Sequence, residues 1–185
     1  KKVVVTYPGL SMKKEGIAKR SSQPYILTVG TLQPRKNFVR LIEAFSHVSK
    51  DYRDTKLVIV GKKGWQYDEI LAAPRKYNIN DRVKFLDFVP DSDLPALYKH
   101  ALCFVLPSLY EGFGLPVLEA MAAGTPVVVS SSSSLPEVAG DAGIYIDPTD
   151  VTSIIKGLKL ALSEQGTSRQ KERIRKGLLQ AKKFT

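Results

Sequence analysis

The sequence predicts a doubly wound α/β domain with a mostly parallel sheet. Short apolar runs alternate along the chain with segments whose apolar residues recur at helical spacing, the order expected of successive strand and helix units. Two of the apolar runs lead into loops with functional residue types, at 31–37 and 108–114. In sheets of this class such loops lie at the carboxyl ends of the strands, where ligands bind.

The composition fits one compact domain. The 185 residues are 43% hydrophobic, and a chain of this length buries roughly 70% of its unfolded surface on folding. The single cysteine, Cys103, lies in an apolar run without a disulfide partner in the sequence, which favours a reducing compartment. No apolar run reaches the roughly 18 residues typical of a transmembrane helix.

The net charge of +10 favours anionic partners. Nucleotide phosphates, an anionic membrane surface and nucleic acid all belong to this class. Much of the excess falls in adjacent pairs that are typical of solvated faces, such as Lys13-Lys14 and Lys62-Lys63. Charge alone therefore does not choose among the partners.

Residues 1–24 are expected to hold a short strand at 3–6, a turn at 7–9 and a polar linker. The alternation of strands and helices then starts at Tyr25. Apolar runs of strand length predict strands at 25–30, 56–61, 83–86, 103–106, 126–130 and 143–147.

The first helix is predicted to begin after Asn37, which is suited to cap it. Its apolar residues follow one face of a helix: Phe38, Leu41, Ile42, Phe45 and Val48. A second helix within 67–77 is expected to break at Pro74. Further helices are predicted at 94–101, 115–124, 151–162 and 168–183, the last of them basic. Ser134 and Glu137 fit a capping box for one more short helix.

The segment 107–136 organises the site. A strand leads into the loop 108–114, Pro116 suits the first turn of the next helix, and Gly124 suits its carboxyl end. The unpaired N–H groups and the positive dipole end of such a helix bind anions, and glycines let a phosphate approach the backbone. Glu119 is suited to accept hydrogen bonds from a ribose diol. The tight loop is expected to bring Glu111 and Glu119 to the rim of one pocket.

The stretch EGFGLPVLE, from Glu111 to Glu119, resembles the two-glutamate signature of retaining glycosyltransferases of the GT-B fold, most closely glycosyltransferase family 4. The similarity runs from TYPGL near the start to AKKFT at the end. It implies the Rossmann-like, carboxyl-terminal half of a GT-B enzyme. Residues 25–185 would form the nucleotide-sugar-binding domain and 1–24 a remnant of the interdomain region, with the amino-terminal acceptor domain absent.

The resemblance also assigns roles to the loop after the second predicted strand. Lys36 matches the family's diphosphate-binding lysine. The family often carries an arginine directly after the strand glycine, where this sequence has Thr31, and Arg35 is expected to take over its role. Both cations would stabilise the charge that develops on the departing diphosphate, because fixed donors need no reorganisation during reaction.

Glu111 resembles the glutamate beside the transferred sugar, and we expect it to be catalytic. Glu119 resembles the ribose ligand, and Val89 resembles the residue whose backbone reads the base, although Asp87 stands where the family usually has glycine. The donor-binding loop between the two glutamates comprises Gly112, Phe113, Gly114, Leu115 and Pro116.

The sequence Asp91-Ser92-Asp93 has the DxD spacing of metal-dependent glycosyltransferases, but its position before a helix favours a capping role. We therefore expect no metal and no cofactor, since the nucleotide diphosphate sugar is the substrate. His47 and His100 lack partners at metal-ligand spacing and are expected to be ordinary surface residues.

These features predict the donor domain of a hexosyltransferase that uses GDP-mannose or a UDP-sugar and is inactive in isolation. The loop TLQPRKN resembles those of bacterial mannosyl-type enzymes, which favours GDP-mannose. Expected partners are the missing amino-terminal domain and a glycan or lipid-linked acceptor, in the cytoplasm or at the inner face of the membrane.

Two alternatives remain at this point. An NAD-binding oxidoreductase domain is suggested by Gly112-x-Gly114-x-x-Val117, although the next strand ends in serines rather than an acidic residue. A nucleic-acid-binding domain is suggested by charge alone, without a zinc pattern or interleaved aromatic and basic residues. We expect no nucleic-acid partner.

Overall fold

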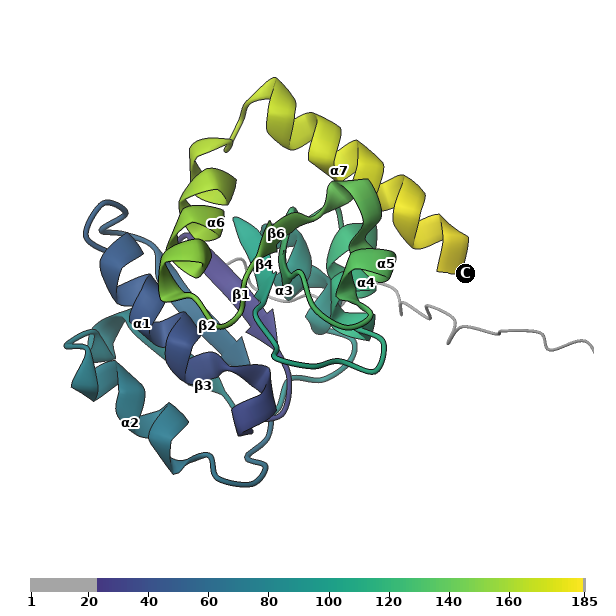
Figure 1. The fold of residues 1–185 in the computed structure, drawn as a ribbon. Helices are drawn as coiled ribbons and strands as arrows, with labels where there is room; N and C mark the ends of the chain where they lie inside the picture. Colours follow the sequence, from purple (N-terminus) through teal and green to yellow (C-terminus); the bar gives the residue numbers. More distant parts are fainter. Residues whose placement is uncertain (1–22, 185) are drawn as a thin grey trace, which may run out of the picture.

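A computed structural model describes residues 23–184 of the chain. The strand expected at 3–6 and the turn at 7–9 lie outside the described residues. Within them, six parallel strands form one sheet in the order β3-β2-β1-β4-β5-β6 (Figure 1). The strands are β1 (Tyr25–Val29), β2 (Lys56–Val60), β3 (Val83–Leu86), β4 (Cys103–Leu106), β5 (Val127–Ser130) and β6 (Ile144–Ile146). The predicted doubly wound fold is confirmed.

Helices cover both faces of the sheet. The helices are α1 (Phe38–Val48), α2 (Asp68–Lys76), α3 (Leu94–His100), α4 (Leu115–Ala122), α5 (Leu135–Ala139), α6 (Val151–Ser163) and α7 (Ser168–Ala181). Short 3-10 turns are η1 (Pro34–Lys36), η2 (Asn80–Arg82), η3 (Gly140–Ala142) and η4 (Lys182–Phe184). The predicted helices are found, with ends that differ by one or two residues.

Two apolar cores result from the alternation of side chains along each strand. Ile26 packs with α1, α2 and α6 on one face, whereas the next residue, Leu27, packs with α3, α4 and α5 on the other. On this second face α7 lies along α4, where Gly177 allows close approach: a Cβ there would lie 3.3 Å from Cγ of Met121. Both faces of the sheet are thus buried from solvent by helices, as is typical of parallel sheets.

The strand order reverses between β1 and β4. The chain proceeds from β1 outward to β2 and β3, and then returns to place β4 on the other side of β1. Loops at such a switch point diverge to opposite faces and leave a crevice at the carboxyl ends of the strands. The loops 31–37 and 107–114 follow these two strands, so the topology brings the two sequence motifs together.

Two of the expected capping roles are wrong for the same reason. Asp93 and Ser134 occupy the N-cap positions of α3 and α5, but neither side chain makes a cap hydrogen bond. Both residues have right-handed helical backbone, with φ −98° at Asp93 and −77° at Ser134, whereas a residue whose side chain caps a helix typically has extended backbone. The capping box predicted for Ser134 and Glu137 is therefore not formed.

Asn37 and Pro74 also differ from expectation. Asn37 has left-handed backbone with φ 60° and does not cap α1; its Nδ2 instead donates to Pro107 O at 3.0 Å and to Pro148 O at 2.7 Å. Pro74 lies inside α2 without ending it. The helix continues for two residues beyond Pro74, and Tyr77 N still donates to Ala73 O. The proline therefore costs α2 one hydrogen bond and leaves its last turn in place.

In the part of the chain that the structure describes, no helix has the length and apolar character needed to cross a bilayer.

Candidate functional site

Two loops meet above the switch point. The main-chain N–H of Leu109, after β4, donates to the carbonyl of Arg35, after β1, at 2.9 Å. The side chain of Asn37 reaches across to Pro107 in the same loop. These contacts join segments some seventy residues apart in the sequence, so η1 and the loop after β4 form one unit.

Four side chains, from Arg35, Lys36, Ser108 and Glu111, converge there and are called the Glu111 cluster. Lys36 Nζ lies 2.5 Å from Glu111 Oε1, and Arg35 Nη1 lies 2.8 Å from Glu111 Oε2. Ser108 Oγ donates to Glu111 Oε1 at 2.6 Å. Arg35 Nη1 also donates to Tyr110 O at 2.5 Å. The structure therefore brings both predicted cations and the predicted catalytic carboxylate into direct contact.

The Glu111 cluster is largely shielded from water. Glu111 is 7% exposed and Lys36 8%, whereas the side chain of Arg35 is 37% exposed. Gly30 leaves room for the lysine, because a Cβ there would lie 3.1 Å from Cε of Lys36. Burial raises the pKa of the Glu111 carboxyl, but hydrogen bonds from Lys36, Ser108 and Arg35 outweigh burial and bring the pKa below the ordinary value of a glutamate. Glu111 is thus held as an anion beside two cations.

The glycine loop ends in an exposed helix start. Gly114 has φ 109° and a Cβ there would lie 2.7 Å from Cδ2 of Leu135, so only glycine fits. At Gly112 a Cβ would meet nothing within 4 Å, so the protein itself does not require a glycine there. Leu115 and Pro116 open α4, whose N-terminus carries the positive end of the helix dipole. The open space at Gly112 leaves the backbone accessible to a ligand.

Phe113 is fixed from the far end of the chain. Its ring packs edge-on against Phe184 of η4, with ring centroids 5.7 Å apart. Phe113 and Val89 are both partly buried against the core that lies under α3, α4 and α5. The carboxyl-terminal segment therefore supports the loop between the two glutamates.

Glu119 contacts a residue that does not belong to the Glu111 cluster. Its Oε2 accepts a hydrogen bond from the hydroxyl of Tyr98, on α3, at 2.7 Å. Burial raises the pKa of Tyr98 well above its ordinary value, with further contributions from the Glu119 charge and hydrogen bond. The tyrosine thus remains a neutral donor that orients the carboxylate. A common rim for Glu111 and Glu119 stays a prediction.

Sequence reasoning missed several polar residues that hold this site. Ser108 is fully buried and contacts Glu111. Four serines further along the chain contact the backbone of the loop 108–113: Ser130, Ser132, Ser133 and Ser134. A signal was present in the sequence, since a run of five serines begins in the last residue of a buried strand and continues into the loop after it. It could not reveal which atoms the hydroxyls contact.

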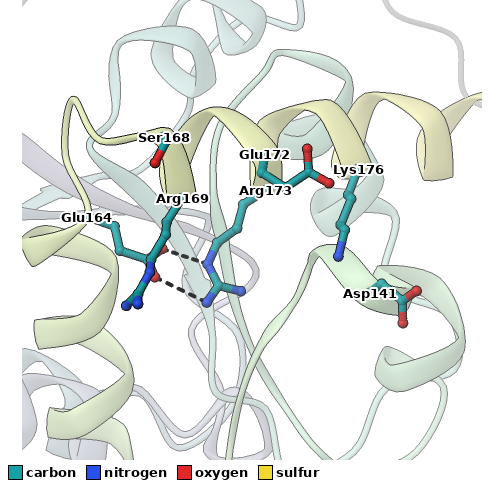
Figure 2. A pocket seen from close by; sticks show the side chains of 7 residues that line it. All are labelled: Asp141, Glu164, Ser168, Arg169, Glu172, Arg173 and Lys176. Carbon is teal, nitrogen blue, oxygen red and sulfur yellow. Dashed lines mark hydrogen bonds and ion pairs between the residues drawn. The ribbon is translucent and has the colours of Figure 1, made fainter.

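A separate pocket lies between α7 and η3 (Figure 2). Figure 2 shows Arg173 reaching Glu164, with two hydrogen bonds of 2.6 and 3.3 Å between them. The lining residues are Asp141, Glu164, Ser168, Arg169, Glu172, Arg173 and Lys176. Acidic and basic groups balance in this set, which contains none of the predicted site residues. The pocket therefore lacks the net positive charge that suits a diphosphate.

Metal ligands do not gather in the described part of the chain: among residues 23–184, no group of three or more His, Cys, Asp or Glu side chains could hold an ion. In the DxD sequence, Ser92 Oγ lies 3.3 Å from Asp93 Oδ1, an exposed local contact.

Comparison with known proteins places the chain in a family. A family model described as glycosyl transferases, group 1, matches residues 12–177. The O-antigen chain mannosyltransferase B of Escherichia coli is 43% identical over 164 residues, which are 88% of this chain and 42% of that protein. The serotype-specific mannosyltransferase WbdA of Escherichia coli is 36% identical over 149 residues, 79% of this chain and 18% of that protein.

A solved structure shares the fold and a part of the sequence. The sucrose-phosphate synthase of Thermosynechococcus elongatus superposes with a TM-score of 0.77 at 27% identity, covering 88% of this chain and 41% of that protein. The chain thus spans less than half the length of each of these relatives. The matches lend no support to an NAD-dependent oxidoreductase or a nucleic-acid-binding domain.

Proposed function

Since this chain belongs to the glycosyl transferases of group 1, we propose that it binds the nucleotide diphosphate sugar of a retaining hexosyltransferase. The donor is GDP-mannose, as the names of the related mannosyltransferases favour, with a UDP-sugar as the alternative. The acceptor is bound largely by a further domain, which relatives more than twice as long have room for.

One observation supports this proposal above the others. Arg35 and Lys36 converge on Glu111 at the switch point, beside the open backbone of Gly112 and the N-terminus of α4. Two fixed cations and a helix N-terminus at a switch point suit an anionic nucleotide. A carboxylate within the same cluster suits the sugar hydroxyls that follow the diphosphate.

The proposed chemistry uses side-chain cations. As the glycosidic bond breaks, negative charge grows on the diphosphate, and Lys36, Arg35 and the start of α4 stabilise it. Glu111 lies beside the sugar, where its negative charge stabilises the positive charge that develops at the anomeric carbon as its bond to the diphosphate oxygen breaks. Glu119, oriented by Tyr98, accepts hydrogen bonds from the ribose. The base lies near Val89, and the loop from Gly112 to Pro116 encloses diphosphate and sugar.

The acceptor is a glycan or a lipid-linked saccharide, and the enzyme works in the cytoplasm at the inner face of the membrane. Support comes from the solvent face of α7, where the basic residues Arg169, Lys171 and Arg175 are exposed. Such charge suits anionic headgroups. Liposome flotation with and without anionic lipid tests this part, and equal recovery with both would contradict it.

The nucleotide is tested by calorimetric titration of the full-length protein with GDP, UDP, NAD and a short DNA duplex. We expect saturable binding of GDP or UDP, and none of NAD or duplex at comparable concentration. Tight binding of NAD or DNA without a response to nucleoside diphosphates would reject the proposal. EDTA should leave the affinity for the nucleotide unchanged, and a large loss would restore a metal role for Asp91 and Asp93.

A further inference from the structure

The serines at the end of β5 and directly after it hold the loop that carries Glu111. Ser130 Oγ donates to Ser108 O at 2.6 Å, and Ser132 Oγ donates to Leu109 O at 3.2 Å. Ser108 is itself the residue whose hydroxyl contacts the Glu111 carboxylate. The start of the loop is therefore tied to the end of the neighbouring strand.

The next two serines contact the peptide groups of Glu111 itself. Ser133 Oγ accepts a hydrogen bond from Glu111 N at 2.9 Å. Ser134 Oγ lies 3.0 Å from Glu111 O and 2.8 Å from Phe113 O, so one hydroxyl bridges two carbonyls. Both peptide groups that flank the Glu111 Cα are thus held by side chains from a different loop.

Resting on the proposed function, we propose that Ser133 and Ser134 are positioning residues that fix Glu111 for glycosyl transfer. They act through the main chain of Glu111, while Lys36 and Ser108 hold its carboxylate. With both ends held, the carboxylate has one orientation towards the sugar. A misplacement of about 1 Å at a reacting group is enough to cost a hundredfold in rate.

The backbone at Ser133 supports a role for the hydroxyl. Ser133 has φ 55°, in the left-handed region of the backbone, which carries a steric cost for serine but not for glycine. It is exposed, so burial does not explain the side chain. The contact that its hydroxyl makes is the one with Glu111 N. A glycine at this position would relieve the backbone strain and remove the hydrogen bond to Glu111 N.

The same contact defines where a bound anion meets the loop. Because Glu111 N is engaged by Ser133, the first N–H beyond it along the loop belongs to Gly112, where a side chain would meet open space. The serines thus orient the glutamate, while the glycines beyond it receive the ligand. Variants at Ser133 and Ser134 are therefore expected to affect turnover more than nucleotide binding.

The test compares Ser133→Gly, Ser134→Ala and Ser134→Thr with the control Ser131→Ala in the full-length protein. Ser131 belongs to the same run, but it is exposed and bonds through its main-chain N to Ile146 O. Release of GDP from GDP-mannose gives kcat and KM, calorimetry gives the affinity for GDP, and amide hydrogen exchange reports on residues 108–114.

Loss of one or two hydrogen bonds should lower kcat by about three- to tenfold in Ser133→Gly and Ser134→Ala. The affinity for GDP should stay within about twofold, because Lys36 and Arg35 remain in place. Ser134→Thr keeps a hydroxyl and should recover most of the rate. Ser133→Gly should unfold at the wild-type temperature or above, so that its lower rate cannot come from a weaker fold.

Exchange of the loop amides should quicken in Ser133→Gly and Ser134→Ala but not in Ser131→Ala. Wild-type kcat in both variants, or unchanged exchange of 108–114, would overturn the positioning role and leave the proposed function standing. A wild-type protein that neither binds GDP or UDP nor releases GDP would instead overturn the proposed function, and the positioning role with it.

Discussion

Two buried glutamates of this domain meet cations in very different settings. Glu164, at the end of α6, pairs with Arg173 nine residues later on α7 (Figure 2). Glu111 pairs with Arg35 and Lys36, about seventy-five residues earlier, across the crevice between β1 and β4. Both carboxylates are less than a tenth exposed, and both have more than one hydrogen-bond donor.

The difference between the two ion pairs lies in what they join. The Glu164–Arg173 pair closes a local turn and fixes the angle between two consecutive helices. The Glu111 cluster gathers two cations of like charge on one carboxylate, which leaves one positive charge uncompensated. It also lies at the one end of the sheet where ligands bind. Burial and ion pairing alone therefore do not identify a site, whereas long sequence separation, excess charge and topology together support the one that we propose.

The largest expected difference between Glu111 and Glu164 appears when one cation is removed from beside each of them. Lys36→Ala should lower kcat for GDP-mannose turnover by about a hundred- to a thousandfold, because a fixed donor to the departing diphosphate is lost. Arg173→Ala should leave kcat per folded molecule unchanged. Steady-state kinetics on the full-length protein decide it, and equal losses in the two variants would show that the pairs do not differ in function.

The converse experiment measures stability. Glu164→Gln keeps the side-chain volume but removes the charge beside Arg173, which should lower the free energy of unfolding by about 1–2 kcal/mol, since the arginine retains partial contact with water. Its kcat should stay at the wild-type value. Thermal and urea unfolding of variant and wild type provide the measurement. A kcat that falls while the unfolding midpoint holds would contradict a local structural role for Glu164.

The pH dependence of the melting temperature should reveal the contribution of the Glu111 carboxylate to stability. The pKa of Glu111 lies below the ordinary value of a glutamate in the folded protein, since burial raises it but hydrogen bonds from Lys36, Ser108 and Arg35 lower it by more. A depressed folded pKa stabilises the fold above the unfolded pKa, and that contribution is lost as the pH falls through the folded value. The melting temperature of the wild type should therefore decline below about pH 4.5 more steeply than that of Glu111→Gln. Parallel curves for the two proteins would refute the shift.

The strands, helices and the meeting of the two motifs could be predicted from the sequence. The spacing of apolar residues within a short segment is enough to predict a strand or a helix. Because parallel strands place the loops that follow them at one edge of the sheet, Lys36 and Glu111 were expected to approach each other. Contacts that depend on side-chain reach were not predictable. Asn37 was expected to cap α1 but spans two loops, and Ser134 was expected to cap α5 but bridges Glu111 and Phe113.

The smallest expected effect concerns Glu119. Like Glu111, it accepts a hydrogen bond from the hydroxyl of a buried residue. If Glu119 binds ribose, Glu119→Ala should weaken GDP binding by about tenfold, because the variant loses the free energy that a hydrogen bond to a charged group contributes to binding. Tyr98→Phe should weaken it by only a few-fold, because the carboxylate remains and loses its orientation alone.

The pair of variants is informative because Tyr98 lies in the core, 1% exposed, and cannot itself reach a ligand. Any effect of Tyr98→Phe on GDP affinity must therefore pass through Glu119. In the double variant the two losses should not add, since the tyrosine has nothing left to orient. Calorimetric titration with GDP measures all four proteins. Additive losses, or an unchanged affinity in Glu119→Ala, would remove the ribose role and leave the Glu111 cluster as the whole of the recognisable site.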